Sequence, residues 1–168
     1  MDAMEAILTR RSIRKYTKQP VPDEVLKELL EAAMCAPSAG NQQPWCFVVI
    51  KDRKILNEIP KYHPYAQMLK EAPVAIFVCC DWDSQLEGYG VQDCSAATQN
   101  MLLAAHAKGL GAVWLGIYPT EPRVTLTKKL LNLPERIIPI SLISIGYPAE
   151  QRPRQDRYRA DRVHYNQW

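Results

Sequence analysis

Three amide side chains stand in a row before an apolar run, in the stretch APSAGNQQPWCFVVI at residues 36–50. They are Asn41, Gln42 and Gln43, and small residues and turn formers precede them. An ordinary loop would carry charged or flexible side chains, whereas adjacent amides offer hydrogen-bond donors and acceptors side by side. The pattern predicts a loop that reads a planar, polar group.

Arginine is concentrated near the two ends of the chain. Three of the 11 arginines lie at positions 10, 11 and 14, and five more lie at positions 152, 154, 157, 159 and 162. The planar guanidinium fork suits phosphate oxygens, so this distribution indicates a phosphate site assembled from both ends. Two solvated basic ends would give the same composition, and the arginine positions alone do not separate these alternatives.

Motifs for several other chemistries are absent. Ser12 and Ser38 have no histidine nearby in the sequence, and no G-x-S-x-G occurs. His106 lies in an apolar segment, so we expect a core histidine with its hydrogen bonds satisfied. The run GLGAVWLG lacks the third glycine of a dinucleotide-binding fingerprint and leads into a strand. Its glycines are instead expected to let a flat group approach the backbone.

The composition is that of a soluble globular domain. The chain has 168 residues, of which 47% are apolar and 23% charged, and one domain is expected at this length. No apolar run approaches the ~20 residues of a membrane span, and residues 1–15 lack a signal-peptide pattern, so we expect a cytoplasmic protein. The five cysteines are odd in number and form no C-x-x-C, which favours buried apolar thiols over disulfides or a zinc site.

Helical and strand patterns alternate along the chain, as is typical of a layered domain with a central sheet. The run VAIFVCC is apolar throughout and predicts a central strand buried on both faces. Pro60 and Pro64 are expected to break the helix that precedes this strand. The predicted order is helix 2–8, helix 22–34, strand 46–50, helix 52–59, a helical piece at 65–72, strand 74–80, helix 91–109, strand 112–117, helix 122–131 and strand 137–146.

Apolar spacing also predicts which helix faces are buried. Met4, Ile7 and Leu8 give the first helix its apolar face, and Leu126 and Leu130 are expected to point inward from the last helix. The segment 81–90, DWDSQLEGYG, is expected to be an exposed loop or a short insert.

Residues 147–168, YPAEQRPRQDRYRADRVHYNQW, do not continue this pattern. They are polar, carry four aromatic side chains and show neither a helical nor an alternating period. A tail that ends in tryptophan is expected to pack on a surface, such as that of a second copy of the chain.

Five motifs in order carry a resemblance to a known family. They are RRSIRKY, PSAGNQQPW, DCSAATQN, GLGAVWLGIYP, and LPERIIPISLISIGYP followed by a basic tail. Each motif alone is weak, but together they span nearly the whole chain, and the sequence resembles the nitroreductase family of flavoproteins.

The resemblance implies an α+β fold in which helices flank a central sheet, and a homodimer with two FMN molecules at its interface. Residues 1–168 would form one FMN-binding domain, with residues 147–168 as an arm on the partner subunit. The FMN contacts that it implies fall into four groups: Arg10, Arg11, Ser12 and Arg14 near the phosphate and pyrimidine; Pro37, Ser38, Ala39, Asn41 and Gln43 from the partner subunit; Leu115 and Gly116 beside the ring; and Arg154 and Arg157 at the phosphate.

The resemblance further implies an NADH- or NADPH-dependent oxidoreductase with a ping-pong mechanism. Its acceptors would be nitroaromatics, quinones or similar small molecules, and Arg14 would stabilise negative charge on the reduced flavin. Other flavin reactions on the same fold, such as dehalogenation, dehydrogenation or flavin fragmentation, remain alternatives. A nucleic-acid-binding arm with Tyr158 and Tyr165 as stacking residues is disfavoured by the net charge of only +3.

Overall fold

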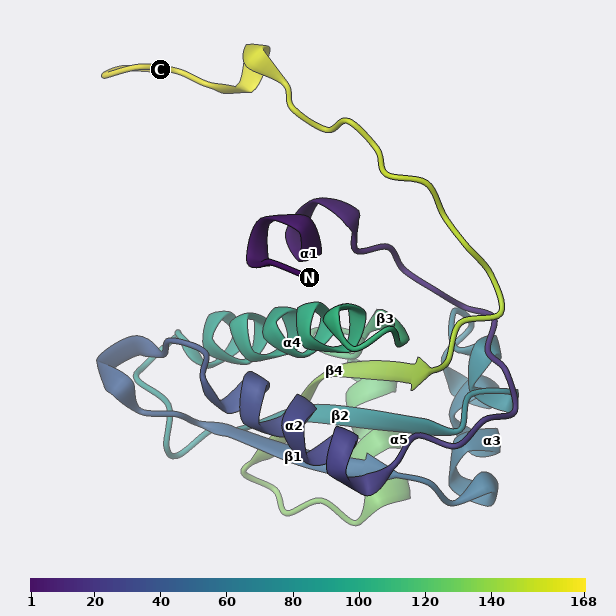
Figure 1. The fold of residues 1–168 in the computed structure, drawn as a ribbon. Coiled ribbons are helices and arrows are strands. Elements are labelled where there is room, and N and C mark those ends of the chain that lie inside the picture. Colours follow the sequence, from purple (N-terminus) through teal and green to yellow (C-terminus); the bar gives the residue numbers. More distant parts are fainter.

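The structure, a computed structural model, describes all 168 residues. Its centre is one antiparallel sheet in the spatial order β1-β2-β4-β3 (Figure 1). The order of helices and strands predicted from the sequence is confirmed, as is the α+β class. The strands are β1 (Trp45–Ile50), β2 (Val74–Asp81), β3 (Gly111–Gly116) and β4 (Ile137–Gly146), and the helices are α1 (Ala3–Thr9), α2 (Asp23–Met34), α3 (Arg53–Tyr62), α4 (Gly90–Ala107) and α5 (Glu121–Leu131).

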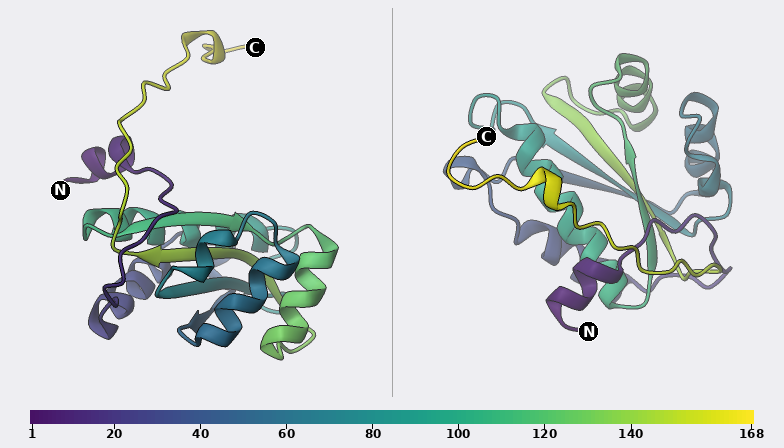
Figure 2. Two further views of the ribbon diagram at one scale, coloured as in Figure 1. Left: turned by 90° about the vertical axis from the view of Figure 1, so that its right-hand side faces the viewer. Right: turned by 90° about the horizontal axis from the view of Figure 1, so that it is seen from above.

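Helices cover both faces of the sheet, which gives three layers. α2 and α4 pack on one face, and α3 and α5 lie on the other, as the view from above shows (Figure 2, right). Each face has its own apolar core, so the sheet is the shared wall between two buried layers. A short 3-10 turn at Gln67–Lys70 joins α3 to β2 on the α3 side.

Side chains of β2 alternate between the two faces of the sheet, so this one strand contributes residues to both cores. Val74, Ile76 and Val78 belong to the core under α2 and α4, whereas Ala75 and Phe77 belong to the core under α3 and α5. All of them are fully or almost fully buried, because successive side chains of a strand point to opposite faces. The predicted central strand is therefore confirmed.

Local signals set the helix ends much as the sequence suggests. The Asp2 side chain accepts a hydrogen bond from the Glu5 N–H at 2.8 Å and caps α1. The Asp52 carboxylate caps α3 in the same way through the Lys54 N–H at 2.7 Å. α5 ends where Asn132 takes up a left-handed conformation with φ of 55°.

The two ends of the chain lie outside the three layers. α1 stands above α4, and the arm that follows β4 runs past α1 and away from the sheet (Figures 1 and 2). Residues 151–168 are all exposed. Met4, Ile7 and Leu8 are exposed too, and only Ala6 of α1 is buried, so the predicted apolar face exists but its own chain covers it only in part.

Three predictions of local structure are wrong. Leu126 is 42% exposed, because α5 turns Val124 and Thr127 inward instead. Pro60 lies inside α3 rather than ending it, and the helix continues to Tyr62. The helical piece expected over 65–72 is reduced to the four-residue 3-10 turn that precedes β2.

No helix in the structure combines the length and the apolar character that crossing a bilayer requires.

The same substitution in two helices tests the assignment of core and surface. Leu29 of α2 is fully buried, so Leu29→Ala should lower the free energy of unfolding by about 2–5 kcal/mol. Leu126→Ala removes an exposed side chain and should change it by less than about 0.5 kcal/mol. Urea unfolding at one protein concentration measures both, and equal losses would contradict the placement of α5.

Candidate functional site

The outer edge of β3 is the feature around which the site is built. β3 is an edge strand, paired only with β4. The Ile117 N–H donates to Ile140 O at 3.1 Å, which places the odd-numbered residues in hydrogen-bonded pairs with β4. The backbone groups of Ala112, Trp114 and Gly116 therefore point to the open edge, where they need other partners.

The segment after α1 covers one end of this edge. Ile13 donates its N–H to Ala112 O at 3.0 Å, and Ser12 forms a parallel bridge with the same residue. The bridge brings the RRSIR motif alongside β3 and leaves the backbone of Trp114 and the Gly116 N–H free. The segment packs so closely on β3 that position 111 has no room for a side chain. A Cβ added to Gly111 would lie 2.6 Å from Ile13 Cγ2.

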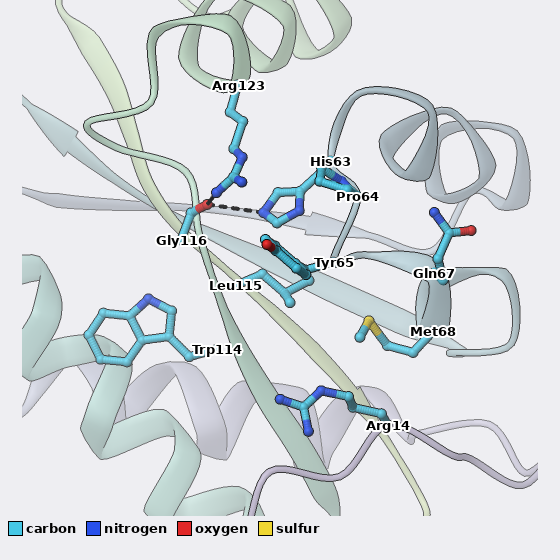
Figure 3. Close-up of a pocket in the computed structure, with 10 residues that line it drawn as sticks. All are labelled: Arg14, His63, Pro64, Tyr65, Gln67, Met68, Trp114, Leu115, Gly116 and Arg123. Carbon is cyan, nitrogen blue, oxygen red and sulfur yellow. Dashed lines mark hydrogen bonds between the residues drawn. The ribbon is translucent and has the colours of Figure 1, made fainter.

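A cavity of about 470 Å³ opens beside the free part of the edge (Figure 3). Three parts of the chain meet there: the segment after α1, the connection from α3 to β2, and the end of β3 with the start of α5. No acidic side chain lines it. The lining residues are Arg14, His63, Pro64, Tyr65, Gln67, Met68, Trp114, Leu115, Gly116 and Arg123.

Two side chains hold the carbonyl of Gly116 at the cavity wall. His63 Nε2 lies 3.0 Å from Gly116 O, and Arg123 Nη1 donates to the same oxygen at 2.9 Å (Figure 3). Because a carbonyl only accepts hydrogen bonds, Nε2 of His63 must carry the proton. Burial lowers the pKa of His63, so the ring is a neutral donor at pH 7.

A second cavity, of about 300 Å³, gathers arginines from both ends of the chain. Arg14 lines both cavities, so the two adjoin. Nη2 of Arg11 is buried without a hydrogen-bond partner, which leaves a donor available to an anion. Burial, with the nearby charges of Arg11 and Arg157, lowers the pKa of Arg10. The lining residues are Arg11, Ser12, Arg14, Arg152, Pro153, Gln155 and Arg157.

Hydrogen bonds to the segment after α1 fix the start of the C-terminal arm. The Arg14 N–H donates to Glu150 Oε1 at 2.6 Å, and Arg11 Nε donates to Pro153 O at 2.8 Å. The bond from Arg14 is also the main cause that lowers the pKa of Glu150. These bonds bring the start of the arm to the arginine cavity, which is lined from this segment by Arg152, Pro153, Gln155 and Arg157.

Several predicted site residues meet in these cavities. Arg11, Ser12, Arg14 and Arg157 share the arginine cavity, and Leu115 and Gly116 line the cavity at the β3 edge. Arg154 instead lines a neighbouring cavity with His106. His106 Nε2 lies 2.8 Å from Thr9 Oγ1, so this histidine has a partner, as expected. Arg10 lines neither of these two cavities, but its charge lies close to the charges of Arg11 and Arg157.

The amide loop, residues 36–45, has a turned backbone and lines neither of the two cavities of its own chain. Gly40, Asn41 and Gln43 have φ values of 57°, 55° and 50°, and the Gln43 N–H donates to Ser38 Oγ at 2.9 Å. None of the loop residues Pro37, Ser38, Ala39, Asn41 and Gln43 lines either cavity. Their predicted contact with FMN from a second subunit stays a prediction.

One buried carboxylate fastens the amide loop to α4. Asp93 is only 5% exposed, and its Oδ1 accepts a hydrogen bond from the Ala39 N–H at 3.0 Å. The second oxygen, Oδ2, has no partner. Trp45, just after the loop, packs against the core under α2 and α4. The loop is therefore held at both ends.

No cysteine lines either cavity. All five are free thiols, and no group of three or more potential metal ligands gathers anywhere in the structure. Cys79, Cys80 and Cys94 are buried, and burial raises the pKa of Cys79 to about 12. That thiol is inert at neutral pH.

Sequence patterns alone did not identify several side chains of the cavity at the β3 edge. His63 and Tyr65 lie in a polar connection between proline residues, and Arg123 looked like any exposed residue of the last helix. His63 and Arg123 meet only through their contacts with Gly116, which is more than 50 residues from His63 in sequence, and Tyr65 lies beside Arg123. The one signal in the sequence is a histidine between two tyrosines, Tyr62 and Tyr65, in the stretch KYHPYAQ.

The chain is thus an α+β protein in which a cavity lined by arginines adjoins a cavity with free backbone groups at the edge of the sheet. The chain matches the model of the nitroreductase family over residues 7–63 and 57–147. It belongs to the nitroreductase family.

Relatives and solved structures agree with this assignment. A protein of Methanothermobacter thermautotrophicus, named provisionally as an NADH dehydrogenase or NAD(P)H nitroreductase, is 53% identical over 169 residues, which cover 100% of this chain and 88% of the relative. A structure from Parabacteroides distasonis with the same provisional name has a TM-score of 0.95 at 42% identity and covers 98% of both chains. A structure from Desulfovibrio desulfuricans, named provisionally as a nitroreductase in complex with FMN, has a TM-score of 0.85 at 36% identity, over 98% of this chain and 96% of the other.

Substitutions at Asp93 test whether its carboxylate holds the amide loop. Asp93→Ala leaves the Ala39 N–H without its acceptor and should cost about 1–3 kcal/mol in the free energy of unfolding. Hydrogen exchange at the Ala39 amide should become faster. Asp93→Asn retains an oxygen acceptor and should protect this amide better than alanine does. Glu71→Ala, an exposed acidic residue without an ion pair, is the control, and unchanged exchange in Asp93→Ala would refute the assignment.

Proposed function

We propose that this protein is an FMN-dependent oxidoreductase that uses NADH or NADPH to reduce nitroaromatics, quinones or similar small acceptors. The observation that carries the proposal is the arrangement at the β3 edge. A cavity with free backbone groups adjoins a cavity lined by arginines, and Arg14 belongs to both. Family membership and the names of the relatives support the same conclusion.

The residues at these cavities fit FMN. The phosphate of FMN carries negative charge, and Arg11, Arg14 and Arg157 with Ser12 offer guanidinium and hydroxyl donors around one space. The orphaned Nη2 of Arg11 is a buried donor that an anion would satisfy. The isoalloxazine edge alternates donors and acceptors, as do the free backbone groups of Trp114 and Gly116.

Each predicted residue has a place in this proposal. Arg10, Arg11, Ser12 and Arg157 would hold the phosphate, Arg14 would lie between the phosphate and the pyrimidine, and Leu115 and Gly116 would lie beside the ring. Arg152 is added to the proposed phosphate contacts because it lines the arginine cavity. Arg154 stays a proposed phosphate contact, from the neighbouring cavity that it lines together with Arg11 and Arg152.

The remaining predicted contacts require a second subunit. We propose a homodimer in which Pro37, Ser38, Ala39, Asn41 and Gln43 reach the cofactor of the partner chain. The hydrogen bond from the loop to the buried Asp93 supports this role, because a loop that is already fixed in the free chain orders little further on binding. Residues 147–168 would pack on the partner as an arm of the single domain 1–168.

Bound FMN would supply the transfer of hydride equivalents between the nicotinamide and the acceptor. NAD(P)H gives two electrons and one proton, and water gives the second proton. These reduce a quinone to a hydroquinone, or a nitro group to a nitroso group with release of water. Tyr65 on the cavity rim is 70% exposed, so solvent reaches the site. Donor and acceptor are expected to use the cavity in turn, which gives ping-pong kinetics.

The visible absorption spectrum of the purified protein tests the proposal. We expect a flavin spectrum that bleaches without oxygen on addition of NADH or NADPH, and recovers when a quinone or nitroaromatic is added. A bound flavin that neither nucleotide bleaches would favour the dehalogenase or dehydrogenase alternatives. A colourless protein that takes up no added FMN would refute the cofactor assignment.

A further inference from the structure

Arg123 is a cation at the cavity that the proposed cofactor contacts do not use. It lies in the first turn of α5, and its Nη1 donates to the Gly116 carbonyl at 2.9 Å. Its guanidinium carbon lies 5.8 Å from the centre of the Tyr65 ring, within cation–π range. Two contacts thus hold the side chain in one place, on the side of the cavity opposite Arg14 (Figure 3).

The charge of Arg123 has no carboxylate partner. The structure contains seven ion pairs, and neither Arg123 nor Arg14 takes part in any of them. Arg136, directly before β4, shows the contrast, because it pairs with Asp81 at 3.2 Å. His63, the other basic residue of the cavity, is neutral. The cavity therefore holds two uncompensated positive charges and no negative one.

The guanidinium of Arg123 still has donors to offer. It has five N–H groups in a planar fork, and only Nη1 has a partner in the structure. A fork that is already fixed loses little conformational freedom when it binds a planar oxyanion such as a carboxylate. A neutral cavity wall would not need such a group, and the Gly116 carbonyl already has His63 as a donor.

We propose that Arg123 makes this site selective for aromatic acceptors that carry an oxyanionic group, such as a carboxylate. The inference rests on the proposed function and adds the substrate class. Arg14 would face the cofactor, which leaves Arg123 to bind the anionic group, with the Tyr65 ring beside it. The phosphates of NAD(P)H offer the same chemistry from another source, and kinetics with each molecule varied in turn separates the two.

A matched pair of acceptors tests the proposal on the flavin-loaded enzyme. 4-Nitrobenzoate and 4-nitrobenzamide have nearly the same shape and differ by one charge. The wild type should show a lower KM for the benzoate. Arg123→Gln should raise that KM by roughly tenfold to a hundredfold, the loss expected for a hydrogen bond to a charged group. Its KM for the benzamide and its kcat should stay within about twofold.

Two further variants separate charge recognition from structural damage. Arg123→Lys retains the positive charge and should recover part of the preference for the benzoate. Lys129→Gln removes an exposed charge from the same helix, outside the cavity, and should leave both KM values unchanged. His63 still donates to Gly116 O in every variant, so the end of β3 keeps a partner.

A binding measurement gives a readout without turnover. Benzoate and benzamide are titrated into the oxidised holoprotein, and the change in the flavin absorbance gives each Kd. Benzoate should bind the wild type more tightly than benzamide, and Arg123→Gln should remove the difference.

Three results would overturn the inference. The wild type treats the charged and neutral molecules alike; Arg123→Gln weakens both equally; or the substitution raises the KM for NADH and NADPH while that for nitrobenzoate is unchanged, which would assign Arg123 to the donor phosphates. All three presuppose a coloured, reducible flavoprotein, so they differ from failure of the proposed function, which the spectrum alone reveals.

Discussion

An edge strand must find partners for its outward backbone groups, and the way β3 meets this need organises the site. The Ile13 N–H donates a hydrogen bond to the carbonyl of Ala112, and His63 and Arg123 donate hydrogen bonds to the carbonyl of Gly116. Between these closed ends the backbone of Trp114 stays open. Three distant parts of the chain thus converge on one short strand, and the space that they enclose is the proposed cofactor site.

The apolar and aromatic side chains that the chain leaves exposed suggest that a second subunit packs against them. The apolar face of α1 is exposed, as are Tyr158, Tyr165 and Trp168 of the arm. The amide loop is preformed, yet it lines neither cavity of its own chain. The proposed homodimer accounts for these three features together, because the loop and arm of one chain would serve the other.

Much of the fold could be predicted from the sequence, because apolar periodicity and turn residues act locally. The order of the nine helices and strands follows from such signals. The orientation of α5 could not be predicted, because a polar residue takes a core position there. Thr127 is buried because its hydroxyl lies 2.9 Å from that of Tyr62, and Leu126 is turned outward as a result. Such a pair, 65 residues apart, leaves no local pattern.

The candidate site could be predicted where the residue types alone indicate the chemistry. Arginine clusters at both ends indicated a phosphate site, and Arg11, Arg14 and Arg157 do meet in one cavity. Which tail arginines face that cavity depends on the path of an extended segment, so the sequence could not separate Arg152 and Arg157, which line it, from Arg154, which lines the neighbouring cavity. Arg123 was missed because its position follows from the packing of α5 on the sheet.

Mixed dimers test the central claim, a cofactor site built from two subunits, most directly. One chain carries Asn41→Ala and Gln43→Ala in the amide loop, and the other carries Arg11→Ala and Arg14→Ala. If each site takes its arginines from one chain and its loop from the other, the mixed dimer has one intact site and one doubly impaired site. It should then bind one FMN per dimer with wild-type affinity, while both mutant homodimers bind weakly. Weak binding at both sites of the mixed dimer would show that loop and arginines act within one chain, and would contradict the account.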